Sequence, residues 1–241
     1  MSLLVLSDVC KAQMRGSRRV EVLRDVSLEI EAGELVAVWG RRRSGRSTLL
    51  SVAAGIEPPD SGEVLFEGRD VNARGTRILG DGVGYCYTGA SAPGGRTVID
   101  HVRSGLLARR VAEPVAHSLA YDALRRVEVE RSNELTMGDL DTAEAVRVAV
   151  ACGLVLGPRV LVIDEPTKGV DLLERDAIVL LLRSLADEGI AVLVSDGDGS
   201  GLADADRALT LSDGELRGKS TPAPGGEVLS LRRPAGTSSA V

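Results

Sequence analysis

The run Gly40-Arg41-Arg42-Arg43-Ser44-Gly45-Arg46-Ser47-Thr48 follows directly on Leu35–Trp39, an apolar stretch typical of a buried parallel strand. The spacing of its glycines and its Ser-Thr ending match a loop whose backbone N–H groups wrap phosphate oxygens at the start of a helix. We expect that helix over Ser47–Ala54. The order strand, loop, helix predicts an α/β fold built around a nucleoside triphosphate.

A second buried strand, predicted over Val160–Ile163, ends in two adjacent carboxylates followed by Pro166-Thr167. Asp164 is placed to hold Mg²⁺ through water, and Glu165 is placed to polarise the attacking water. Two exposed turn carboxylates are the alternative interpretation. That alternative does not explain the apolar run that precedes the pair.

The remaining predicted ligands come from residues 40–48, which we call the phosphate loop. Its glycines permit a tight path, the Ser47 hydroxyl suits Mg²⁺, and Thr48 can reach the α-phosphate. The predicted cofactors are therefore ATP and Mg²⁺. The predicted nucleotide contacts are Gly40, Arg43, Ser44, Gly45, Arg46, Ser47 and Thr48, and the predicted metal ligands are Ser47 and Asp164.

Arg46 stands where such loops carry lysine. A guanidinium keeps the positive charge but is larger, planar and forked, so we expect it not to fit the slot of an ammonium group. The neighbouring residues 41–43 are also arginines. They either help to hold phosphate or are solvated loop residues, and the sequence leaves both interpretations open.

Composition excludes several classes of protein. The chain has 241 residues, only 2% aromatics and a net charge of −6, which argue against a nucleic-acid-binding protein. Its three cysteines have no metal-ligand spacing and indicate reduced thiols in a cytosolic protein. We expect neither a signal peptide nor a spanning helix, so any membrane association has to go through a partner.

The alternation of strands and helices predicts one domain over residues 1–220, with an inserted helical subdomain at about 95–157 and a partly disordered tail at 221–241. Both histidines are expected on the surface of the helical subdomain. The other predicted elements are strands at Leu3–Leu6, Val26–Ile30, Glu63–Phe66, Gly82–Tyr87, Ile190–Val194 and Ala208–Ser212, a turn at Asp213-Gly214, and a helix at Leu172–Glu188.

With these motifs, the chain resembles the ATP-binding subunit of ABC transporters from Leu3 to about Arg217. Flanking segments that carry the resemblance include Val22–Leu28, Pro59–Leu65 and Arg147–Ala151. The nearest branch serves permeases of the lipoprotein-release and macrolide-export type. The resemblance implies a P-loop NTPase fold of ABC type, with a mostly parallel sheet core, antiparallel N-terminal strands and an inserted helical subdomain.

The resemblance also implies partners and a location. It implies a homo- or heterodimer with another ATP-binding subunit, in which each nucleotide lies between the phosphate loop of one chain and the signature motif of the other. It implies docking on a transmembrane permease subunit, which would place the chain in the cytoplasm at the inner face of the cell membrane.

Several positions depart from the family's pattern. The nucleotide-stacking aromatic falls on Gln13, the glutamine after the Gly-Tyr strand on Thr88, and the switch histidine on Gly197. The signature motif reads Leu140-Asp141-Thr142-Ala143-Glu144. Its Asp141 would repel the partner site's γ-phosphate unless it turns away to cap a helix.

These departures predict ATP binding with weak hydrolysis, by in-line attack of water on the γ-phosphate. The alternative is a catalytically inactive pseudo-ATPase that acts as a structural or regulatory partner of an active subunit. A soluble phosphoryl-transfer kinase with the same loop is disfavoured by the inserted helical subdomain and by the Asp-Glu-Pro-Thr run.

Overall fold

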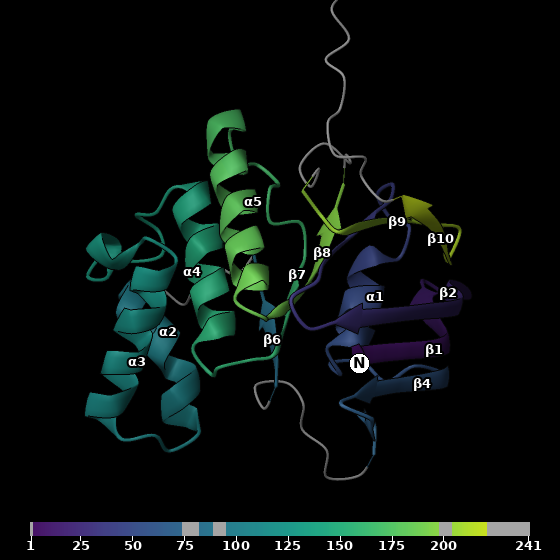
Figure 1. Ribbon diagram of the computed structural model, residues 1–241, viewed down its shortest axis with the longest axis horizontal. Helices are drawn as coiled ribbons and strands as arrows, with labels where there is room; N and C mark the ends of the chain where they lie inside the picture. The colour runs from purple at the N-terminus through teal and green to yellow at the C-terminus, as the bar shows by residue number, and fades with distance from the viewer. Residues whose placement is uncertain (1, 74–81, 89–94, 198–203, 221–241) are drawn as a thin grey trace, which may run out of the picture.

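A computed structural model describes residues 2–73, 82–88, 95–197 and 204–220. It contains two β-sheets and helices on both sides of the larger sheet (Figure 1). The predicted tail, 221–241, lies outside the described residues. Among the helices described, none combines the length and apolar character needed to cross a bilayer.

The larger sheet has six strands in the order β10-β9-β3-β8-β7-β6. Five of them are parallel, and β10 pairs antiparallel with β9 after the predicted Asp213-Gly214 turn. The sequence does not predict β10, because its residues form no continuous apolar run. The strands are β3 (Leu35–Trp39), β6 (Val83–Cys86), β7 (Val160–Ile163), β8 (Ala191–Asp196), β9 (Arg207–Ser212) and β10 (Glu215–Ser220).

The smaller sheet is antiparallel, in the order β2-β1-β4-β5. The predictions Leu3–Leu6 and Val26–Ile30 were far too short, because β1 and β2 each run for 14 residues. Register shifts and the positive φ angles of Asp8 (48°) and Asp25 (46°) interrupt the alternation of apolar and polar residues, which hid the length of the hairpin. The strands are β1 (Ser2–Arg15), β2 (Arg18–Glu31), β4 (Ser61–Phe66) and β5 (Arg69–Asp70).

The six-stranded sheet separates two hydrophobic cores. In β3, Leu35 and Ala37 belong to the core shared with α2–α5, whereas Val36 and Val38 belong to the core shared with α1 and the smaller sheet. Figure 1 shows α2–α5 on one side and α1 with β1, β2 and β4 on the other. The helices are α1 (Arg46–Ala53), α2 (Val98–Ala108), α3 (Glu113–Arg126), a 3-10 turn (Glu130–Ser132), α4 (Thr142–Leu154) and α5 (Leu172–Asp187).

Three neighbouring parallel strands carry the predicted site at their carboxyl ends. β3 leads into the phosphate loop, β7 leads into Asp164 and Glu165, and the adjacent β8 ends at Asp196 beside Gly197. Ligands of open α/β sheets bind at this edge. The order β3-β8-β7 therefore brings together segments that lie more than a hundred residues apart in the sequence.

Candidate nucleotide-binding site

The phosphate loop has the tight path that its glycines predict. Gly45 caps the N-terminus of α1 with φ 107°, and a Cβ there would lie 2.7 Å from the carbonyl oxygen of Val22. A Cβ on Gly40 would lie 2.5 Å from the carbonyl oxygen of Leu211. Because the backbone passes so close to its neighbours, neither position accepts a side chain without a shift of the loop.

Two further residues of the loop are unusual. Arg43 has φ 70°, a left-handed conformation that is strained for a residue with a side chain. Within the described part of the chain, the Ser44 Oγ is the one buried side-chain oxygen or nitrogen that lacks a hydrogen-bond partner. An unpaired hydroxyl in a loop whose path requires glycine is consistent with binding of an oxygen-rich ligand.

Arg46 does not extend into the loop as a free cation. Its guanidinium donates from Nη1 to the carbonyl oxygens of Gly40 and Asp196, and from Nη2 to Glu165 Oε1. The residue is only 7% exposed. In this arrangement Arg46 links the phosphate loop to both carboxyl-end segments.

The two predicted carboxylates differ in their surroundings. Asp164 Oδ1 accepts a hydrogen bond from Ser195 Oγ, and the same hydroxyl accepts the backbone N–H of Glu165 at 3.0 Å. Glu165 has φ 48° and binds Arg46 through one carboxylate oxygen and Lys168 through the other. Ser195 is not among the site residues predicted from the sequence. Its position near the end of a buried strand is the signal that could have identified it.

A cavity of about 390 Å³ brings several of these side chains together. At the wall of this cavity, Thr88 Oγ1 donates to the carbonyl oxygen of Asp164 at 2.7 Å. Burial and the nearby Asp164 carboxylate raise the pKa of Tyr85 to about 12, so its phenol stays protonated at neutral pH. The lining residues are Ser47, Ser51, Tyr85, Cys86, Tyr87, Thr88, Asp164, Glu165 and Lys168.

Gln13 lies over the other end of the loop. Its Nε2 donates to Thr48 Oγ1 at 3.0 Å, and the two residues line a cavity of about 150 Å³. The position that the resemblance assigns to a stacking aromatic is thus next to the loop, but it carries an amide that binds the protein itself. The cavity is also lined by Val22, Arg43, Ser44, Gly45, Arg46 and Ser47.

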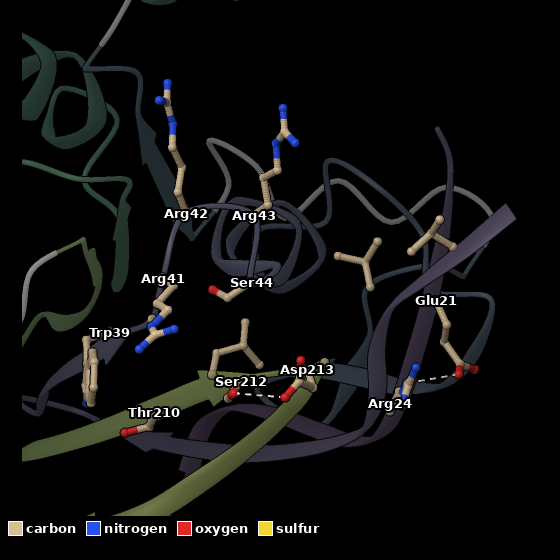
Figure 2. Close-up of a pocket in the computed structure, with 15 residues that line it drawn as sticks. Glu21, Arg24, Trp39, Arg41, Arg42, Arg43, Ser44, Thr210, Ser212 and Asp213 are labelled. Atoms are coloured by element: carbon tan, nitrogen blue, oxygen red, sulfur yellow. Dashed lines mark hydrogen bonds and ion pairs between the residues drawn. The ribbon is translucent and has the colours of Figure 1, made fainter. Parts of the chain in front are cut away.

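A further cavity of about 620 Å³ lies between the loop and the β9–β10 hairpin. Figure 2 shows Arg41 turned toward Trp39, whereas Arg42 and Arg43 extend away from the hairpin. Trp39, the single tryptophan, is 41% exposed in this cavity. Its position makes it a natural fluorescent reporter of the loop.

The two histidines differ in exposure, although both are predicted to lie on the surface. His117 is exposed on α3, as expected, but His101 on α2 is half-buried. Its burial, together with the positive charge of Arg96, lowers its pKa. The three cysteines are free thiols, as expected.

Comparisons with known proteins show the family of this chain. Residues 23–168 match the ABC transporter family. The chain is 33% identical over 221 residues to the lipoprotein-releasing system ATP-binding protein LolD of Myxococcus xanthus, covering 90% of this chain and 99% of that protein. It is 31% identical over 222 residues to LolD of Syntrophotalea carbinolica, covering 90% and 98%.

Solved structures show the same fold. The dimeric cassette MJ0796, in a post-hydrolysis state bound to ADP and Pi, superimposes with a TM-score of 0.82 at 25% identity, over 92% of this chain and 100% of that one. A second dimeric structure of the same bacterial ABC transporter cassette gives a TM-score of 0.83 at 26% identity, over the same shares of the two chains. The predicted P-loop NTPase fold of ABC type is confirmed, and the chain belongs to the ABC transporter family as an ATP-binding subunit.

Proposed function

We propose that this chain binds ATP with Mg²⁺ at the phosphate loop and couples nucleotide binding to a membrane permease, while hydrolysing ATP slowly. The observation that carries the proposal is the meeting of the loop with Asp164 and Glu165 at one edge of the sheet. Loop amides at the start of α1 suit phosphate oxygens, and the helix dipole adds to that attraction.

The residues present fit a magnesium ion. Ser47 is exposed and lines the same cavity as Asp164, so a hydroxyl and a carboxylate face one space. Mg²⁺ typically takes one or two protein oxygens together with phosphate and water. When bound, the ion would neutralise charge on the phosphate oxygens. Ser195 orients the Asp164 carboxylate for that role.

Glu165 is the proposed general base, and two cationic side chains of the same chain bind its carboxylate. Each of its carboxylate oxygens already accepts a charge-assisted hydrogen bond, from Arg46 and from Lys168. A water molecule is therefore left with the remaining lone pairs of a carboxylate that two cations already bind. Gly197 has no side chain to donate a hydrogen bond to the γ-phosphate, and the loss of one such donor typically costs about 3 kcal/mol in activation free energy.

The pairing of Glu165 with two cations also favours a second candidate function. In that case the chain binds nucleotide without turnover and acts as a structural or regulatory partner of an active subunit. Phosphate release that depends on Glu165, measured against the Glu165→Gln variant, separates slow hydrolysis from none.

The proposed partners follow from the family. Two relatives are ATP-binding proteins of lipoprotein-releasing systems, and two structures of one similar cassette are dimeric. We expect a dimer, with a second copy or another ATP-binding subunit, attached to a permease at the inner face of the cell membrane. Identification of the proteins that co-purify with the chain from membranes tests this expectation and identifies the permease.

Trp39 emission tests the binding site itself. Millimolar ATP with Mg²⁺ is expected to change the emission and to raise the melting temperature, with about 2.7 kcal/mol of added stability at a hundredfold excess over Kd. The response is expected to weaken in Asp164→Asn and to persist in Asp122→Asn, an exposed carboxylate on α3. If neither emission nor melting temperature responds in the wild-type chain, the proposal is wrong.

A further inference from the structure

The Arg46 guanidinium is held by a set of acceptors that only a forked side chain can satisfy. Two of them are the carbonyl oxygens of Gly40, in the phosphate loop, and of Asp196, at the end of β8, and the third is the Glu165 carboxylate. A lysine ammonium is a single point charge and cannot span these positions in the same way. Because Arg46 is almost fully buried, withdrawal of the guanidinium would break three hydrogen bonds at once.

Gly197 forms the wall next to this guanidinium. A Cβ built on Gly197 would lie 3.3 Å from Glu165 Oε1 and 3.7 Å from each terminal nitrogen of Arg46. The first distance is tight and the other two are ordinary contacts, so a side chain at position 197 would begin against both members of the ion pair. Glycine at position 197 therefore leaves unfilled the space beside the Arg46 guanidinium.

We infer that Arg46 and Gly197 are mutually dependent positioning residues: Gly197 leaves room for the Arg46 guanidinium, which binds one oxygen of the Glu165 carboxylate. This inference deepens the proposed function and rests on it where turnover is concerned. It implies that neither residue can be exchanged alone with full benefit. Lysine at 46 would free one oxygen of Glu165, while Lys168 still binds the other, and would leave the phosphate without a donor from position 197. Histidine at 197 would start in contact with the guanidinium and crowd it.

Turnover tests this dependence in the full chain. Phosphate release is compared in the wild type, Arg46→Lys, Gly197→His and the double variant, with Glu165→Gln added to the double variant as a control. We expect the double variant to release phosphate at least about tenfold faster than the wild type, as gain of a phosphate donor allows. Each single variant is expected to stay within about threefold of the wild-type rate. The inference is overturned if Arg46→Lys alone reaches the double variant's rate, or if the double variant is no faster than the wild type.

Melting temperature tests the same dependence without nucleotide. Gly197→His is expected to lower it clearly in the Arg46 chain and by less than half as much in the Arg46→Lys chain, a rescue that a purely local defect at 197 would not give. Gly105→His is the matched control, because a Cβ at Gly105 meets nothing within 4 Å, and its effect is expected to be equal in both backgrounds. Equal shifts for Gly197→His in the two backgrounds would overturn the inference.

The two tests separate this inference from the proposed function. If ATP with Mg²⁺ leaves Trp39 emission and melting temperature unchanged, the proposed function fails, whereas the comparison of melting temperatures without nucleotide still decides the relation between Arg46 and Gly197. If nucleotide binds and the effects of the two substitutions are independent, only the inference fails.

Discussion

The side chains of Asp141 and Glu144 cap the N-terminus of α4 reciprocally. Asp141 Oδ1 accepts the backbone N–H of Glu144 at 2.8 Å, and Glu144 Oε2 accepts the backbone N–H of Asp141 at 3.1 Å. This capping box resolves the alternative that the sequence left open, because the carboxylate is turned to the helix that it begins. A helix N-terminus also stabilises the negative charge.

Replacement of Asp141 separates its charge from its capping role. Asp141→Ala is expected to lower the free energy of unfolding by about 1 kcal/mol, the usual cost of a lost cap. Asp141→Ser keeps a capping oxygen and removes the charge, so we expect a loss of only a few tenths of a kcal/mol. Urea unfolding monitored by circular dichroism measures both, and equal losses in the two variants would contradict the capping role.

The sequence predicted those elements that are decided by local burial. β3 and β7 were predicted with their observed bounds, because strands buried on both faces read as unbroken apolar runs. The β1–β2 hairpin was underestimated because its bulges break the alternation of residue types. β10 depends on pairing with β9 rather than on its own composition.

The sequence predicted candidate residues for the site but not the contacts between them. The loop and the two carboxylates follow from motif spacing, and the structure places Arg46, Asp164 and Glu165 at one edge of the sheet. The direction of the Arg46 side chain depends on the Asp196 carbonyl, 150 positions away in the chain, and on the space at Gly197. The role of Ser195 likewise depends on β8 lying beside β7. Strand order, which the sequence did not provide, decides both.

The three thiols are expected to differ in reactivity. Burial raises the pKa of Cys152 to about 12 and also raises that of Cys86, so almost no thiolate forms at either position near pH 8. Cys10 is only partly buried on β1. We expect iodoacetamide to label Cys10 first in the native chain and all three in concentrated urea, as measured by peptide mass spectrometry. Native labelling of Cys86 at the rate of Cys10 would contradict the packing of β6 on α4.

His101 is expected to make the chain less stable in mild acid. Its burial, with a contribution from Arg96, lowers its pKa below the ordinary 6.5. Below that value the unfolded chain binds a proton that the folded chain does not, so the free energy of unfolding decreases as the pH falls toward the folded pKa. The variant His101→Gln is expected to lose less stability between pH 7.5 and 5.5 than the wild type in urea titrations. His117→Gln, on the exposed face of α3, serves as the control and should behave as the wild type.

Gln13 is expected to limit nucleotide affinity. The side chain lies at the end of the phosphate loop and donates to Thr48, so it presents no ring on which a base can stack. Stacking of a base on an aromatic side chain is worth about 1–3 kcal/mol. Gln13→Tyr is therefore expected to tighten ATP binding about fivefold or more, with a similar gain for GTP because every base has a stacking face.

Met14→Tyr is the matched control: Met14 is the next residue of β1, it is exposed, and successive side chains of a strand point to opposite faces. Isothermal titration calorimetry in the presence of Mg²⁺ measures all three proteins. Equal affinities for Gln13→Tyr and Met14→Tyr would mean that the base does not lie over position 13.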